Sequence, residues 1–346
     1  MSTQEETTVT TERASLKSVA LAVAGMLWMA GLLWSARATI TGRADVYMEV
    51  TSTAYALPGA ISASLVAGAA VGLFSRRFKN RAGTTVRFAI STGAGLALGL
   101  LGAVVMLTIN TEGWVYAVVA GSIAAAATIG GALGGLRQAS VVAAVCWAAM
   151  AVFLVGVLLT FAQGVLFGLF GAGDSPASQV GAANWYSLTQ AVVSGIVAGV
   201  LVHRLLRGAP VRWVWIAGAG AGPGLLQVIA EILTRTAGAR VLDLAGKVSA
   251  LERTVQQMLS GARLNSAMII LFVGAITAAI AVGRTLKPPS PASPSSAPPS
   301  PAPPSPAASS PAESSPAASS PASPSSAAAS PASSAGGSPA RSEDAG

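Results

Sequence analysis

Eight apolar stretches, each about 20 residues long, constrain the fold of this chain more than any other feature. Only 10% of the residues are charged, whereas soluble domains carry about 25%. An α-helix needs about 20 consecutive apolar residues to cross a bilayer. The sequence therefore predicts an all-α polytopic membrane protein with spans near 17–36, 52–74, 88–109, 114–136, 141–165, 186–206, 213–233 and 264–284.

The basic residues are distributed as expected for a chain whose N-terminus is cytoplasmic. With that orientation, 14 of the 21 Lys and Arg residues lie in cytoplasmic segments, and the whole net charge of +8 lies on that side. This is the positive-inside pattern, so nucleic acid is not needed to explain the charge. The run SRRFKNR at 75–81 fits an inside loop, with an anionic-lipid patch as the alternative. We expect the plasma membrane, with both the N-terminus and the C-terminal tail cytoplasmic.

The two ends of the chain differ from its apolar middle. Residues 1–15 are predicted to be a polar cytoplasmic segment, followed by a first span that either stays attached or is cleaved after Ala36-Arg37-Ala38. Residues 286–346 consist mainly of Pro, Ser and Ala and contain no aromatic residue. Such a segment cannot bury enough apolar surface to fold, so we predict a disordered spacer. Richness in Ala, Arg and Gly suggests a bacterial source of high GC content.

Two stretches of the chain repeat each other, which indicates an internal duplication. YALPGAISASLVAGAAVGLFSR at 55–76 matches YSLTQAVVSGIVAGVLVHRLLR at 186–207, and VRFAISTGAGLALGLL at 86–101 matches VRWVWIAGAGAGPGLL at 211–226. We therefore predict two parallel four-helix repeats, 16–140 and 141–285. An even number of spans in each copy implies a pseudo-two-fold axis along the membrane normal.

Glycine-interrupted helices at matching positions are the best sequence indication of a transporter binding site. A proline in the second copy should kink or unwind its helix. The alternative is close helix packing through small residues. On the first interpretation, a water-filled cavity would lie between spans 88–109 and 213–233. The candidate residues are Gly93, Gly95, Gly99, Gly218, Gly220, Pro223 and Gly224.

Glu231 is the only acidic residue inside a predicted span, and a carboxylate at such a position is a functional candidate. It lies near the outer end of its span, and Arg235 follows four residues later in the order that favours a helical ion pair. Gln227, one turn earlier, could extend the polar face. An interfacial ion pair is thus the alternative to a role in gating.

The sequence offers no set of residues for catalysis. It contains one histidine and one cysteine, so neither a zinc site nor a catalytic triad can be assembled within the bilayer. We expect no enzyme, no metal and no cofactor. Cys146 lies in an apolar run and should be a buried, inert thiol.

A heptad stripe lies between the last two spans, in a predicted extracytoplasmic amphipathic helix at 240–260. Such a stripe needs a surface to cover it: the protein's own bundle, the lipid interface, another protein or a second copy. The helix has no counterpart in the first copy, where the corresponding segment is only 110–113. Its apolar residues, Val241, Leu244, Val248, Leu251, Val255 and Met258, are candidates for partner docking.

Two functions fit these features. The first is a permease-like or channel-like transport component, favoured by the duplication and the glycine-broken spans. The second is a membrane scaffold or accessory subunit that docks a partner through the heptad stripe, favoured by the scarcity of buried polar groups. Besides the lipid bilayer, the sequence identifies neither a partner nor a substrate.

Overall fold

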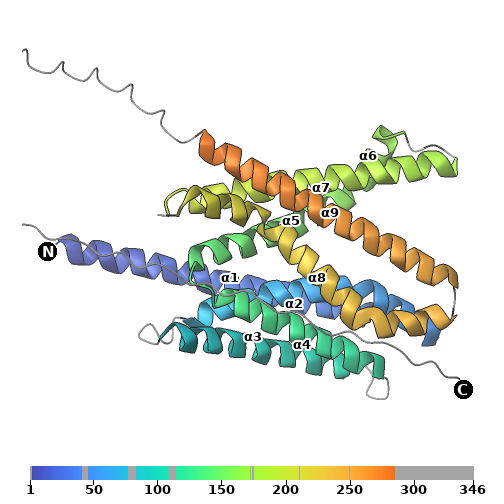
Figure 1. The fold of residues 1–346 in the computed structure, drawn as a ribbon, viewed down its shortest axis with the longest axis horizontal. Helices are drawn as coiled ribbons and strands as arrows, with labels where there is room; N and C mark the ends of the chain where they lie inside the picture. The colour runs from blue at the N-terminus through green and yellow to red at the C-terminus, as the bar shows by residue number, and fades with distance from the viewer. Residues whose placement is uncertain are drawn as a thin grey trace, which may run out of the picture. The chain divides into compact units, whose positions relative to one another are not determined.

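The computed structural model describes residues 2–40, 46–76, 83–108, 114–171, 173, 175–209, 211–248 and 250–284. The Pro/Ser/Ala segment 286–346 and most of the basic run 75–81 lie outside these residues. Every regular element in the described part is a helix (Figure 1). The helices are α1 (Ser2–Ile40), α2 (Val46–Ser75), α3 (Thr84–Leu107), α4 (Trp114–Gly134), α5 (Ala139–Phe161), α6 (Gln163–Leu169), α7 (Pro176–Leu206), α8 (Trp213–Val248) and α9 (Ala250–Gly283).

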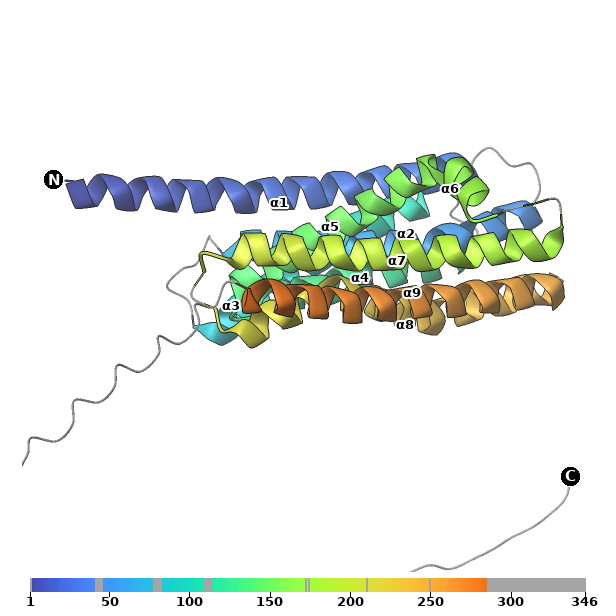
Figure 2. The ribbon, with the colours of Figure 1, turned by 90° about the horizontal axis from the view of Figure 1, so that it is seen from above.

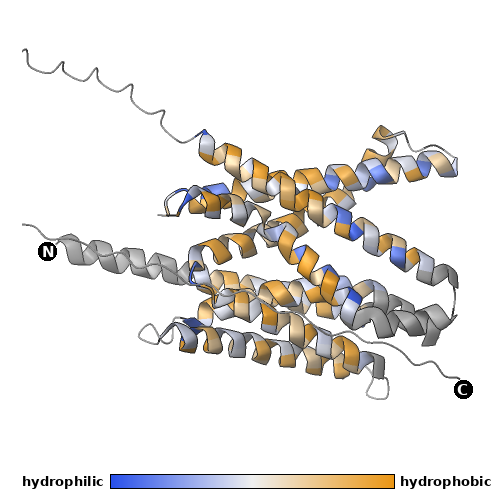
Figure 3. Cartoon of the chain, viewed as in Figure 1, coloured by the Kyte–Doolittle hydropathy of each residue, from blue (hydrophilic) through white to orange (hydrophobic). Residues whose placement is uncertain are grey.

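Eight of these helices, all except α6, are long and apolar enough to cross a membrane. Apolar residues run along them in Figure 3. Large apolar side chains also face outward: Leu27, Trp34 and Phe161 are 67%, 74% and 86% exposed. Soluble proteins seldom expose such continuous apolar surface. The helices are therefore compatible with a membrane-embedded, multi-span protein, as the sequence predicts.

Several helices extend beyond the apolar stretches that predict them. α7 begins at Pro176, ten residues before the expected span, because Ser175 caps it: the Ser175 hydroxyl accepts a hydrogen bond from the Ser178 backbone N–H at 3.2 Å. Proline at the first helical position suits such a start. The short helix α6 after α5 is not expected from the sequence. It has no buried residue.

The amphipathic helix expected at 240–260 is not a separate element in the structure. α8 continues past Gly238 to Val248, and α9 begins at Ala250 and continues past Gly261. The heptad stripe is therefore divided between the end of one helix and the start of the next. A single glycine costs a helix only about 1 kcal/mol, so the two flanking glycines do not end the helices.

Close glycine contacts join α3 and α4. A Cβ at Gly95 would collide with the carbonyl oxygen of Ala127 and lie 2.7 Å from the Cα of Gly131. A Cβ at Gly99 would lie 2.7 Å from the Cα of Ala124. Small residues thus let the two backbones approach closely, which is how helices associate tightly in a bilayer.

The same kind of contact joins α8 and α9. A Cβ at Gly220 would lie 2.5 Å from the carbonyl oxygen of Gly274 and 2.7 Å from the Cβ of Ala278, and one at Gly224 would lie 2.6 Å from the Cα of Leu271. The three contacted residues each lie 147 positions after Ala127, Gly131 and Ala124, the residues contacted in the first half. The glycines themselves lie 125 positions after Gly95 and Gly99.

A further helix in each half, α2 or α7, makes the same kind of close glycine contact. A Cβ at Gly68 on α2 would collide with the carbonyl oxygen of Ala127, and a Cβ at Gly199 on α7 would lie 2.7 Å from the carbonyl oxygen of Gly274. In each half two helices, α2 and α3 or α7 and α8, pack against all the other membrane-length helices of that half. The helix pairs that pack inside the first half therefore have matching pairs inside the second.

The contact between the halves does not have the expected two-fold symmetry. α8 packs against α2 and α4, but α3, its counterpart, packs against neither α7 nor α9 within the described residues. A two-fold axis would require both contacts. The two halves instead contact each other side by side through different surfaces, an arrangement called head to tail because the contact is not two-fold symmetric (Figures 1 and 2).

Candidate functional site

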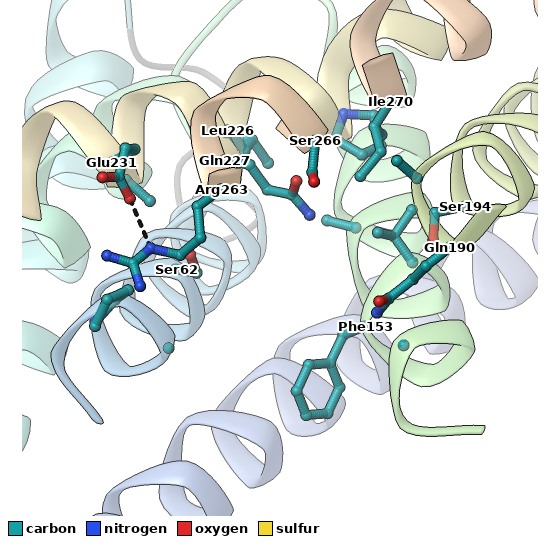
Figure 4. A pocket seen from close by; sticks show the side chains of 18 of the residues that line it. Ser62, Phe153, Gln190, Ser194, Leu226, Gln227, Glu231, Arg263, Ser266 and Ile270 are labelled. Atoms are coloured by element: carbon teal, nitrogen blue, oxygen red, sulfur yellow. Dashed lines mark hydrogen bonds and ion pairs between the residues drawn. The ribbon is translucent and has the colours of Figure 1, made fainter. Parts of the chain in front are cut away.

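A cavity of about 590 Å³ lies among α1, α2, α5, α7, α8 and α9. Figure 4 shows it from close by. Its lining comes from the half of the bundle near the ends of α5 and the starts of α2 and α9. The connections with Arg76, Arg137, Arg207 and Arg212 are at the other end. By its size the cavity lies within the range typical of small-molecule sites, about 300–1,000 Å³.

The bundle is closely packed between this cavity and the end that carries these arginines, the basic end. The lining residues nearest the basic end include Val66, Ser194, Pro223 and Ile270. Beyond them the glycine contacts of α7, α8 and α9 begin, and a Cβ at Gly222 would lie 2.7 Å from Val145 Cγ1. Close packing therefore separates the cavity from the basic end.

The basic end is held together by Arg76. Its Nη1 donates hydrogen bonds to the carbonyl oxygens of Leu136, at 2.6 Å, and Gly134, at 3.3 Å, at the end of α4. Burial lowers the pKa of the Arg76 guanidinium, and the nearby charge of Arg87 lowers it further. This arginine fixes the end of α2 against the end of α4.

Glu231 is at the centre of a charged cluster at the end of the cavity farthest from the basic end. Its side chain is only 5% exposed, and its carboxylate oxygens lie 3.3 Å from Arg235 Nε and 3.1 Å from Arg263 Nε. The Ser260 hydroxyl donates to the same carboxylate. The ion pair with Arg235, predicted from the spacing, is confirmed. The carboxylate is also bound by α9, so the cluster ties two helices together.

The two arginines use their donors differently. Arg235 also donates from Nε to the Ser260 hydroxyl, at 2.9 Å, and from Nη2 to the Ser260 carbonyl, at 3.3 Å. Arg263 contacts Glu231 through Nε alone. Its terminal nitrogens make no hydrogen bond to any other described residue, and its side chain lines the cavity. Arg263 therefore has donors left for a ligand.

Two amide side chains line the middle of the cavity. Gln190 of α7 and Gln227 of α8 point into the same space in Figure 4. Neither makes a side-chain hydrogen bond to another residue in the described part. Nearby, the hydroxyls of Ser187 and Ser266 lie 3.4 Å apart. These groups offer both donors and acceptors, so the cavity is suited to a polar or partly polar molecule.

One wall of the cavity is aromatic. The rings of Trp28 and Phe153 lie with centroids 4.9 Å apart and tilted by 42°. The indole Nε1 of Trp28 is buried and has no hydrogen-bond partner among the described residues. An aromatic wall with a free donor is a surface on which an apolar group with a polar edge can bind.

The sequence-predicted site residues are divided between the cavity and the helix contacts. Pro223, Gln227 and Glu231 line the cavity. α8 stays helical through Pro223 rather than unwinding. Four glycines are helix-packing residues, namely Gly95, Gly99, Gly220 and Gly224, and two have open space at the Cβ position, Gly93 and Gly218.

This cavity does not lie between α3 and α8, where the sequence leads us to expect one. No residue of α3 lines it, and α3 does not pack against α8 in the described residues. The cavity instead lies between α8 and helices of both halves. The reason is the head-to-tail packing, because the expected position depends on a two-fold axis.

Sequence reasoning misses three residues that line the cavity, Arg263, Gln190 and Trp28. It places Arg263 in the loop before the last span, because a charged residue ends a hydropathy window. The spacing of Arg263 from Glu231 carries no signal, since the two are on different helices. Gln190 is detectable, because it is an amide inside a predicted span.

The candidate docking residues lie mostly outside the described side chains. This applies to Val241, Leu244, Val248 and Leu251. Of the other two, Val255 is half-buried and Met258 is 70% exposed. The end of the stripe nearest the membrane is therefore partly open.

The arrangement can bind a small molecule from one end of the bundle. It can also hold a charge inside an apolar environment, because Glu231 is neutralised by arginine. No group of three or more metal-ligating residues occurs among the described residues. The sequence matches no family model, no curated protein and no solved structure.

Proposed function

We propose that this chain is a permease-like membrane component that takes a small solute into a cavity open to the extracytoplasmic side. The observation that carries the proposal is the cavity of about 590 Å³, which extends from the Glu231 cluster to Pro223 inside the bundle. A scaffold would be expected to fill such a space, since protein interiors are close-packed. Polar groups inside a membrane are costly and are usually functional.

The orientation follows from charge. The closed end of the bundle carries Arg76, Arg137, Arg204, Arg207, Arg212 and Arg284, and cytoplasmic ends collect such residues. The cavity is at the opposite end. The N-terminus and the tail would then be cytoplasmic, and the solute would enter from outside.

The proposal includes an internal duplication. The matching glycine contacts, at offsets of 131, 125 and 147 residues for the second, third and fourth helices, support it. The polar residues of the cavity belong mainly to the second half. Gly102 and Met106 of α3 stand where α8 has Gln227 and Glu231. The second half would thus have acquired the binding groups, and the first half would form the supporting wall.

Pro223 gives α8 a place to bend. A proline in a helix removes a backbone donor and is a common cause of kinks. It lies at the floor of the cavity, between the open half and the packed half of α8. Bending there would move Gln227 and Glu231 relative to the glycine contacts. With a single buried carboxylate in the described residues, we propose facilitated movement of the solute rather than coupling through a carboxylate relay.

Cysteine accessibility tests the cavity and its orientation. In a Cys146→Ala background, Ser266→Cys should react with the membrane-impermeant reagent 2-sulfonatoethyl methanethiosulfonate added outside intact cells. Cys146 of the unsubstituted protein is the matched control, because it is 1% exposed in α5, below the cavity. It should react only after denaturation.

Each result of this experiment has a clear meaning. Reaction at Ser266→Cys from outside, with Cys146 silent, supports an outward-facing wet cavity. Reaction only in inside-out vesicles would reverse the proposed orientation. Silence from both sides would mean a dry bundle. The second candidate function, a scaffold that docks a partner near the exposed Met258, would then be favoured.

A further inference from the structure

We propose that the ligand of this cavity is a small organic anion with an apolar body, whose anionic group binds Arg263. This inference rests on the proposed function, because it names the chemical class that the same cavity takes. It depends on three observations: the charge of the cluster, the free donors of Arg263, and the aromatic wall opposite.

The charge of the cluster favours an anion. Glu231 is the only acidic residue among the described side chains, and it is shared by two arginines. The cluster therefore carries one positive charge in excess. A cationic ligand would have to compete with both arginines for one carboxylate. An anionic ligand would meet a charge that no other described residue neutralises.

The position of the free donors specifies where the anion binds. Arg235 gives Nε to Glu231 and to the Ser260 hydroxyl and Nη2 to the Ser260 carbonyl, and it is not among the residues that line the cavity. Arg263 gives only Nε to Glu231, and Figure 4 shows its terminal nitrogens turned away from that carboxylate. A guanidinium binds carboxylate, phosphate or sulfonate through two parallel hydrogen bonds. Arg263 is therefore the anchor of the ligand.

The opposite wall specifies the rest of the molecule. Trp28 and Phe153 form a tilted aromatic pair, and Leu32 adds apolar surface. Gln190 and Gln227 line the same cavity as this wall and Arg263, where they could bind a polar group of the ligand. An apolar body of ring size, joined by a short linker to an acid, would satisfy both ends.

Three compounds with one apolar body test this inference: 4-phenylbutyrate, 4-phenylbutanol and 4-phenylbutylamine. The full-length protein in phosphatidylcholine nanodiscs is titrated by calorimetry, with empty discs subtracted. The acid should bind about tenfold more tightly than the alcohol, because a hydrogen bond to a charged group contributes more than a neutral one. The amine should bind more weakly than the alcohol.

Two substitutions act in opposite directions. Arg263→Gln should reduce the affinity for the acid to that for the alcohol. Glu231→Gln should increase the affinity for the acid several-fold, because it removes the competing carboxylate. Arg204→Gln, at the other end of α7, is the matched control and should leave all affinities unchanged. Each variant is first shown to be monodisperse, so that misfolding is not read as lost binding.

Four results would overturn the inference: equal binding of all three compounds, tighter binding of the amine, an unchanged preference in Arg263→Gln, or no binding of any of the three. None of these results concerns whether the cavity is open to water, which the reaction of Ser266→Cys measures separately. Failure of the ligand class and failure of the proposed function are thus distinguishable.

Discussion

A single added methyl group at Gly95 or Gly220 is expected to destabilise the protein strongly, whereas the same change two residues earlier should be tolerated. Ala at position 95 would place its Cβ against the backbone of Ala127 on α4, and Ala at position 220 would meet the backbone of Gly274 on α9. Backbone atoms cannot rotate away as a side chain can. Overpacking of this kind costs about 1–3 kcal/mol and sometimes more.

The control is contained in the same sequence motif. Gly93 and Gly218 precede these glycines by two residues and are exposed, and no atom lies within 4 Å of the place that a Cβ would take. Gly→Ala at either position should be neutral, or stabilising by up to about 1 kcal/mol, through the helix propensity of alanine. The measurement is the thermal midpoint of detergent-purified protein, followed by fluorescence size-exclusion chromatography.

The two pairs of variants also test the role of the glycines. Equal behaviour of positions 93 and 95, or of 218 and 220, would contradict the close helix contacts. It would also restore the interpretation that these residues loosen the helices around a solute. A large difference at both pairs would support matched packing in the two halves.

Removal of the Glu231 carboxylate is expected to give the second-largest effect. Glu231→Ala leaves two arginines without their ion-pair partner and removes one of the acceptors that join α8 to α9, while Arg235 keeps its bonds to Ser260. Breaking a fully buried ion pair costs about 3–5 kcal/mol. We expect a smaller loss here, because the side chains of Arg263 and Arg235 are 35% and 47% exposed and water screens them.

Two further variants separate charge from shape. Glu231→Gln keeps an acceptor for the Ser260 hydroxyl, so it should lose less stability than Glu231→Ala. Arg235→Gln removes the more exposed partner, which should cost at most about 1 kcal/mol. The thermal midpoints of the three variants rank these losses of stability. If Arg235→Gln were as damaging as Glu231→Ala, the less exposed Arg263 would not be the stronger partner of Glu231.

The helices were predictable from the sequence because a bilayer imposes their length and polarity. The sequence also identified the glycines of α3 and α8 as notable but left open whether they pack or bind, and Gly95, Gly99, Gly220 and Gly224 lie at close helix contacts. The helix ends were less predictable. Gly238 and Gly261 look like boundaries, yet α8 and α9 continue through them, because one glycine is a weak helix breaker.

The site was predictable only in part, for a physical reason. Glu231, Gln227 and Arg235 share one helix, so their spacing of four residues places them together. Arg263, Gln190 and Trp28 reach the same cavity from three other helices. The proximity of Arg263 and Gln190 depends on how α7, α8 and α9 pack inside the second half, and that of Trp28 depends on how the two halves pack. Spacing along the sequence predicts neither arrangement.

Accessibility of Gln190→Cys from both sides of the membrane tests the central claim most directly. Gln190 lines the cavity on α7 and is half-buried, whereas Cys146 is buried. In a Cys146→Ala background, the variant is treated with 2-sulfonatoethyl methanethiosulfonate in intact cells and in inside-out vesicles. A permease that alternates between two open ends predicts reaction from each side. Reaction from the outer side alone would contradict it, and would leave a binding cavity that does not carry its ligand across.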